Sequence, residues 1–132
     1  MEKGFLPIPT AEAWQVSNAP VLSMAAHKAA LDIFMEAGMN ALIEKSHKLT
    51  GYMEFVVRTV SDRLEIITPQ ENRGCQLSII AHGKGKELFN KLTENGVISD
   101  WREPNVIRCA PVPLYNTFED IYRFGELLKK AY

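Results

Sequence analysis

The stretch 105–121 constrains the fold most, because a strand pattern runs directly into a proline-rich turn and a helix start. Alternation along the strand places Ile107 and Cys109 on one face and Arg108 on the other. The two prolines that follow donate no backbone hydrogen bond, so the chain leaves the sheet there. An unpaired guanidinium is costly to bury, so we expect Arg108 to meet an anion or to reach water.

A helix start closes this stretch. Thr117 and Asp120 have the spacing of a capping box, in which each side chain accepts a hydrogen bond from the other residue's backbone N–H. The spacing predicts a last helix over Phe118–Ala131. The stretch therefore holds a cation at the end of a sheet, beside a helix start.

The remaining patterns predict an α+β fold with the element order ααββαββα. The expected elements lie at residues 20–37, 39–60, 64–68, 75–81, 84–95, 97–102, 105–110 and 118–131. Short turns between consecutive strands favour antiparallel pairs, and one helical crossover links the two hairpins. We expect an antiparallel sheet of about four strands, covered on one face by helices. The opposite face, with Arg108, is available to pack on something outside this chain.

Three residues mark details of the two leading helices. Asn18 is expected to cap the first helix, with Pro20 in its first turn. Gly38 is expected to end that helix. Gly51 lies inside the second helix, where glycine costs about 1 kcal/mol relative to alanine, so we expect close packing there.

Length and composition favour one domain over residues 1–132, with residues 1–16 as an extended arm that indicates a start inside a larger protein. The net charge of -1 gives no indication of nucleic acid or of an acidic membrane surface as a partner. Neither a membrane-span pattern nor a signal-peptide pattern occurs, so we expect a cytoplasmic protein. Cys75 and Cys109 lie in apolar strand patterns and are predicted to be buried reduced thiols, with a bridge as the alternative.

The usual patterns of catalytic and metal sites are absent from the sequence. There is no P-loop, no GxGxxG and no metal-ligand spacing. His27, His47 and His82 are scattered, and the cysteines lack an identifiable partner base. The spacing of residues alone therefore predicts only an α+β domain with one arginine, Arg108, inside a strand.

Several motifs of this sequence resemble those of known enzyme families. Residues 108–111 with 114–120 resemble the C-terminal small domain of fold-type I pyridoxal-phosphate enzymes, a part shared by cysteine desulfurases and several aminotransferases. Residues 16–20, 73–78 and 107–116 together resemble the kynureninase family, over nearly the whole chain. Ala19 stands where the family commonly has proline, and Cys109 where it commonly has valine.

The resemblance implies a reaction and a division of labour. Kynureninases hydrolyse L-kynurenine to anthranilate and L-alanine with pyridoxal 5'-phosphate as electron sink, and act as homodimers. Whether L-kynurenine or 3-hydroxykynurenine is preferred stays open. The lysine that carries the cofactor, its phosphate-binding groups and the aspartate beside its ring nitrogen belong to the large domain of such enzymes. This chain is therefore expected to hold no catalytic residue and no metal, and to be inactive alone.

The resemblance also assigns three site residues. Arg108 matches the arginine that holds the substrate α-carboxylate, and the structural alternative is an arginine paired to an internal acid. Asn18 matches an asparagine near the cofactor and the aromatic end of the substrate, with Ser17 beside it. For Ser17 and Asn18 the alternative is helix capping. Two competing hypotheses remain: the small domain of another fold-type I enzyme, and a stand-alone α+β ligand-binding or regulatory module.

Overall fold

The computed structural model describes residue 4 and residues 6–132, and it divides into two units, one up to Gly38 and one over residues 39–132. The units are described separately below. Residues 1–3 and 5, which belong to the predicted arm 1–16, lie outside the described residues. The prediction of a single domain with that arm stays a prediction.

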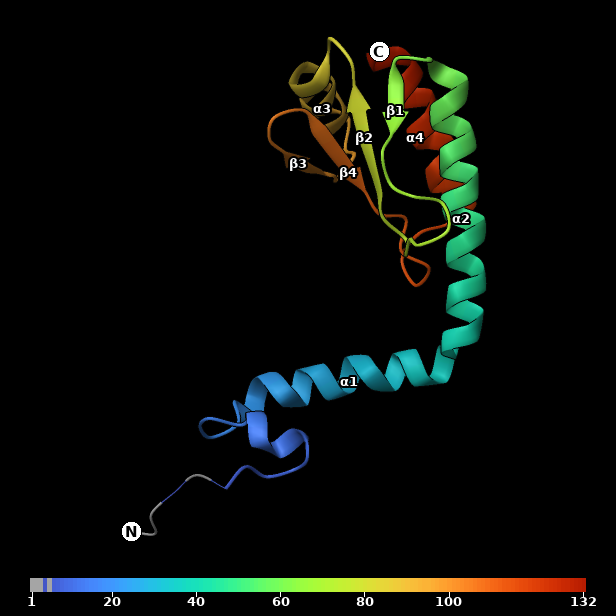
Figure 1. The fold of residues 1–132 in the computed structure, drawn as a ribbon. Coiled ribbons are helices and arrows are strands. Elements are labelled where there is room, and N and C mark those ends of the chain that lie inside the picture. Colours follow the sequence, from blue (N-terminus) through green and yellow to red (C-terminus); the bar gives the residue numbers. More distant parts are fainter. Residues whose placement is uncertain (1–3, 5) are drawn as a thin grey trace. The chain divides into compact units, whose positions relative to one another are not determined.

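The first unit contains a short 3-10 helix, η1 (Ala11–Trp14), and the helix α1 (Val21–Ala37) (Figure 1). Pro20 occupies the N-cap position of α1, and no side chain caps the helix. The expected cap by Asn18 is therefore wrong, because Asn18 lies two residues before the cap, whereas a capping side chain belongs to the N-cap residue itself. Gly38 ends α1 as predicted, with φ of 78°.

The second unit is an α+β sandwich that confirms the predicted fold class, and its elements together with α1 follow the predicted order. Its elements are α2 (Met39–Val60), β1 (Leu64–Ile66), β2 (Leu77–Ala81), α3 (Gly85–Glu94), β3 (Asp100–Arg102), β4 (Val106–Cys109) and α4 (Phe118–Ala131). The four strands form one antiparallel sheet in the order β1-β2-β4-β3. Figure 1 shows α2 and α4 running side by side next to this sheet.

Several strands are shorter than their sequence patterns predict. The predicted strand 97–102 begins only at Asp100, because the backbone N–H of Val97 donates to the Leu92 carbonyl at 3.0 Å and so extends the end of α3. At the other edge, the ladder of β1 ends at Ile66. Beyond Ile66, the Thr68 hydroxyl takes the place of a backbone carbonyl and accepts a hydrogen bond from the Ser78 N–H at 2.8 Å.

The core lies between one face of the sheet and the three helices of this unit. Its strand residues are those that alternation places inward, and its helix residues form the facing stripes. Among them are Leu49, Met53, Val57, Leu77, Ile79, Leu88, Leu92, Ile107, Ile121, Phe124 and Leu128. Removing these side chains from water is the main favourable contribution to the fold.

The close approach between helices occurs at a different glycine from the one expected. A Cβ at Gly51 would have no atom within 4 Å, so the prediction of close packing there is wrong. A Cβ at Gly125 of α4 would lie 2.5 Å from Cγ1 of Val56 on α2. Gly125 therefore allows α2 and α4 to pack against each other.

Both cysteines are free, as predicted. Cys109 is buried, and its burial raises the pKa of the thiol to about 12. Cys75 precedes β2 and is only partly buried. The prediction of a buried thiol is therefore confirmed for Cys109 and wrong for Cys75.

No helix in the described part of the chain is both long enough and apolar enough to cross a membrane.

Candidate functional site

Arg108 lies in the middle of β4, on the sheet face that points away from the helices. Its neighbours across the ladder are Ser78 on β2 and Asp100 on β3. Cross-strand partners share a face, so Ser78, Asp100 and Arg108 form one row across the outer face. The Arg108 side chain is 29% exposed, and the predicted alternation of β4 is confirmed.

Asp100 is the anion that Arg108 meets within this chain. Arg108 Nε donates a hydrogen bond to Asp100 Oδ2 at 2.8 Å, and Arg108 Nη2 donates to the same oxygen. Arg102 Nε donates to that oxygen at 3.0 Å. The hydrogen bond from Arg108 holds the pKa of the Asp100 carboxyl below its ordinary value, with Arg102 acting in the same direction.

This row has a surplus of positive charge. Arg102, which follows Asp100 by two residues on the same face, and Arg108 share the Asp100 carboxylate, so these three side chains together carry one formal positive charge. The Nε–Nη2 edge of Arg108 is engaged, whereas Nη1 donates to no residue in the part of the chain that the structure describes. The arrangement suits an anion that approaches from the free end of the guanidinium, and an arginine fork binds a carboxylate through two parallel hydrogen bonds.

The loop after β4 is held in place by specific contacts. Asn116 Oδ1 accepts the Val112 N–H at 2.9 Å, and the Val112 carbonyl accepts the Asn116 N–H at 2.8 Å. Lys45 Nζ on α2 donates to the Pro113 carbonyl at 2.6 Å. The predicted capping box of Thr117 and Asp120 is present and starts α4. The path of the chain leaving the Arg108 strand is therefore fixed from both sides.

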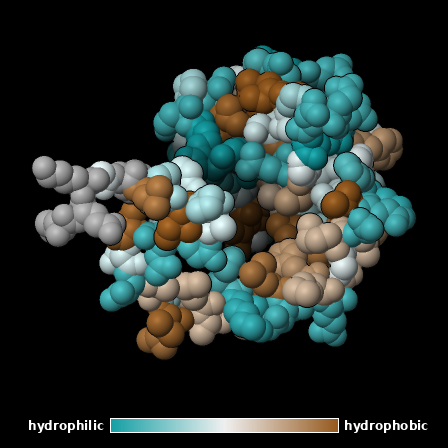
Figure 2. Space-filling model, turned by 60° about the horizontal axis from the view of Figure 1, so that its bottom comes forward, coloured by the Kyte–Doolittle hydropathy of each residue, from teal (hydrophilic) through white to brown (hydrophobic). Residues whose placement is uncertain are grey.

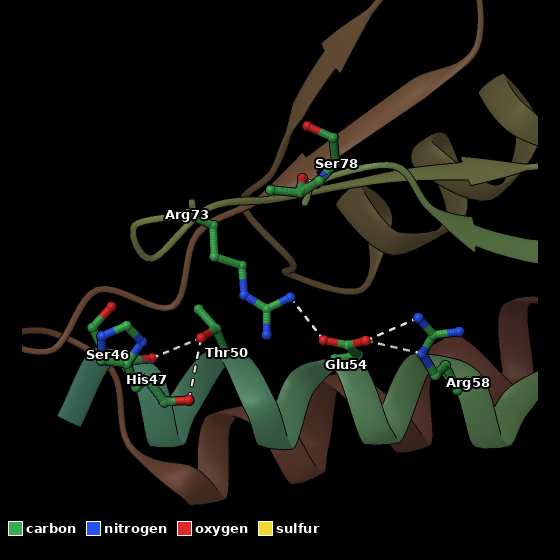
Figure 3. A network of polar contacts seen from close by, with 8 residues as sticks. Ser46, His47, Thr50, Glu54, Arg58, Arg73 and Ser78 are labelled. Atoms are coloured by element: carbon green, nitrogen blue, oxygen red, sulfur yellow. Dashed lines mark hydrogen bonds and ion pairs between the residues drawn. The ribbon is translucent and has the colours of Figure 1, made fainter. Parts of the chain in front are cut away.

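A second polar network joins the loop before β2 to α2 (Figure 3). Arg73 Nη1 donates to Glu54 Oε2 at 2.7 Å, while Arg58 donates to the other oxygen of Glu54 from Nε and Nη2. The Arg73 side chain is only 5% exposed and that of Glu54 15%. In the sequence, Arg73 lies in the family motif 73–78, and no partner was predicted for it. Its partner Glu54 is 19 residues away on another element, so only the fold could reveal the pair.

Ser17 and Asn18 belong to the first unit, where both are exposed in the segment before α1. Arg108 belongs to the second unit, so the surroundings of the three predicted site residues are described separately. Asn18 does not cap α1, which leaves its carboxamide available for other contacts.

The other candidates have no clustered partners. His82 Nε2 lies 2.7 Å from Glu65 Oε2 in an exposed pair on the outer sheet face. Within the described ranges, no three His, Cys, Asp or Glu side chains are grouped so that they could hold a metal ion.

Sequence reasoning missed Asp100, although a signal for it was present. Asp100 and Arg102 are two residues apart in a predicted strand, so they share a face. Pairing of that strand with 105–110 brings one of them to Arg108, but only the register decides which. The fold and the site together assign this chain to the α+β domains, with an arginine–acid pair on the open face of the sheet.

Comparisons with known proteins identify the family. The sequence profile described as "Kynureninase C-terminal domain" matches residues 42–128. The chain is similar to the kynureninase of Christiangramia forsetii, with 56% identity over 99% of this chain and 32% of the relative. It is 51% identical to the kynureninase of Flavobacterium psychrophilum over the same shares, and 52% identical to that of Xanthomonas oryzae pv. oryzae over 94% of this chain and 31% of the relative.

The chain belongs to the kynureninase C-terminal domain family. This confirms the family resemblance of its motifs and favours it over a desulfurase or an aminotransferase. The chain spans about a third of the length of these curated relatives.

Proposed function

We propose that the complete protein hydrolyses L-kynurenine to anthranilate and L-alanine, and that this chain supplies the arginine that holds the substrate α-carboxylate. The family match supports the reaction, since the relatives carry the name kynureninase. The observation that carries the role of Arg108 is the free end of its guanidinium on the open sheet face. 3-Hydroxykynurenine carries the same amino-acid group and is an equally suitable substrate for this contact.

Pyridoxal 5'-phosphate, when bound, supplies the electron sink for this reaction. The described residues fit a supporting contact to the cofactor rather than its main binding site. Asn18 is the candidate, because its exposed carboxamide is not used as a helix cap and has both a donor and an acceptor. The lysine that carries the cofactor is proposed to lie in the remaining two thirds of the protein, so this chain alone is proposed to be inactive.

Arg108 orients the substrate in this proposal. A carboxylate held by two parallel hydrogen bonds has little rotational freedom, so the bond to be broken keeps one position relative to the cofactor. Ser17 and Asn18 are proposed to lie near the aromatic end of the substrate. Binding at both ends of the substrate would then depend on residues of this chain.

The proposal includes partners for α1. No residue of α1 is buried. Even the apolar side chains of Val21, Leu22 and Met35 are each more than two-thirds exposed. Figure 2 shows brown, hydrophobic areas on the surface of the chain. We propose that the rest of the complete protein covers this helix and that the protein is a homodimer. The two free thiols fit a cytoplasmic location.

The test uses the complete protein with Arg108→Lys, which keeps the charge but loses the fork. Loss of a charge-assisted hydrogen bond costs about 1.5–3 kcal/mol, so kcat/KM for L-kynurenine should fall about 10- to 150-fold. The release of anthranilate is followed by its fluorescence. The exposed Arg123 on α4 provides the matched control, Arg123→Lys, with unchanged kinetics expected.

Two outcomes would contradict the proposal. The first is turnover of L-kynurenine by the 132-residue chain alone with added pyridoxal phosphate. The second is a large drop in melting temperature of Arg108→Lys with near-normal kcat/KM, which would make Arg108 a structural partner of Asp100 only.

A further inference from the structure

Asp100 faces Arg108 directly across the β3–β4 ladder and binds one edge of its guanidinium. We propose that Asp100 is a positioning residue that aims the free edge of Arg108 at the carboxylate of an amino-acid substrate. This inference rests on the proposed function, since it assumes that Arg108 binds that carboxylate. It assigns a role to a residue that the sequence motifs did not single out.

The geometry of the guanidinium supports this role. The group is planar, with N–H bonds at fixed directions, so binding of one edge determines where the others point. Asp100 Oδ2 accepts from Nε and Nη2, which together form the side edge of the group. The Nη1–Nη2 end edge still offers two parallel N–H groups. That number and direction match a carboxylate with its two oxygens.

Asp100 is itself held in place. Its backbone is paired with that of Arg108 in the ladder, and its Oδ2 also accepts from Arg102 at 3.0 Å. The two guanidinium groups keep the pKa of its carboxyl low, so it stays charged when a substrate arrives. Because Arg102 and Arg108 share this one carboxylate, the three side chains together still attract a second anion.

A different role would predict the opposite result. If Asp100 were only a counter-ion that the substrate displaces, then removing its charge would free Arg108 and strengthen carboxylate binding. If Asp100 positions Arg108, then removing its charge loosens the fork and weakens carboxylate binding. The sign of the change in affinity therefore separates the two roles.

The experiment compares two ligands on the complete protein with Asp100→Asn, which preserves the shape of the side chain. The first ligand is L-kynurenine, and the second is the amine that L-kynurenine becomes when its α-carboxylate is removed, measured as a competitive inhibitor. We expect kcat/KM for L-kynurenine to fall about tenfold, mainly through KM, as for one weakened charge-assisted hydrogen bond. The inhibition constant of the amine should not change, because it makes no contact with Arg108.

The controls separate charge, folding and position. Glu65→Gln makes the same charge change on the same sheet face, but on β1 at the opposite edge, and should leave both ligands unaffected. Asp100→Ala removes both acceptor oxygens and should weaken L-kynurenine more than Asp100→Asn does. Thermal melting of each variant shows whether the protein is folded, and the amine shows whether the rest of the site is intact.

Four results would overturn the inference. A higher affinity for L-kynurenine in both Asp100 variants would make Asp100 a displaced counter-ion, and an unchanged affinity would leave it without a role in binding. In either case the proposed function would stand if Arg108→Lys still lost activity. Equal losses for L-kynurenine and the amine would make Asp100 a purely structural residue. Normal kinetics of Arg108→Lys would remove the proposed function, and with it the role of Asp100.

Discussion

At the scale of single residues, two carboxylates each hold two arginines in this protein. Asp100 holds Arg108 and Arg102 on the outer sheet face, and Glu54 holds Arg73 and Arg58 beside α2. The surroundings differ, because the Arg73 side chain is almost completely removed from water, whereas Asp100 is about half exposed. The Glu54 pair should therefore matter for stability, and the Asp100 pair for orientation.

Glu54→Gln should lower the free energy of unfolding by about 1.5–3 kcal/mol, because Arg73 loses its charged acceptor in a place that water hardly reaches. Urea denaturation of the 132-residue chain measures the change. Glu119→Gln removes the acid of an exposed pair on α4 and should change stability by under about 1 kcal/mol. Equal effects of the two substitutions would contradict the special role of Glu54.

The same residue predicts a pH dependence. The hydrogen bond from Arg73 is the main reason why the pKa of Glu54 lies below 4.5 in the folded chain. Burial of Glu54 opposes this shift but has a smaller effect. The lowered pKa means that the folded state binds the proton less readily than the unfolded state. The stabilising contribution of the Glu54 carboxylate is therefore complete above about pH 4.5. It is lost as the pH falls through the lowered pKa of the folded chain. Denaturation at stepwise lower pH should show a shallower acid loss in Glu54→Gln than in the unmodified chain.

At the scale of elements, the approach of α2 and α4 depends on one glycine. Gly125 leaves space for the Val56 side chain, and a methyl group there would overlap it at 2.5 Å. Helix α2 also extends beyond the core, since Ile43 near its start is exposed. The buried residues of α2 thus begin at Leu49, and Val56 further along approaches Gly125 closely.

Two glycine substitutions test this packing with opposite expected signs. Gly125→Ala should destabilise the chain by about 1–2 kcal/mol, because overpacking by one methyl group outweighs the gain in helix propensity. Gly51→Ala should stabilise it by about 0.5–1 kcal/mol, because nothing lies within 4 Å and only the propensity changes. Urea denaturation of both variants measures the two changes. A stabilised Gly125→Ala would show that α2 and α4 can separate without cost.

At the scale of the whole molecule, the chain forms a core within its second unit but leaves α1 without one. The apolar side chains of α1 face water in this structure, which is typical of a helix that belongs against another surface. The chain spans about a third of the length of its relatives, and covering of α1 by the remaining part of the complete protein is part of the proposal above.

The 132-residue chain should therefore self-associate as its concentration rises. Leu22→Lys together with Met35→Lys should weaken that association, because both side chains are exposed apolar groups on α1. Light scattering over a concentration series gives the mean mass. Ile98→Lys, at an exposed apolar residue of the second unit, is the control and should have no effect. A single monomer mass at every concentration would contradict the expectation.

Features that depend only on neighbouring residues could be predicted from the sequence. Gly38 ends α1, Thr117 and Asp120 start α4, and alternation along β4 turns Arg108 away from the core. These outcomes follow from backbone conformation and from the period of the side chains, which operate over a few residues. The order of the elements followed from the same local rules.

Contacts between residues on different elements could not be predicted, because they depend on how the folded chain packs. The choice of Asp100 rather than Arg102 opposite Arg108 depends on the strand register, and the Arg73–Glu54 pair on where a loop meets a helix. Gly125, not Gly51, marks the close helix contact, because only packing shows which glycine faces a neighbour. Such contacts join residues that local patterns treat independently, so their energies appear only once the chain has folded.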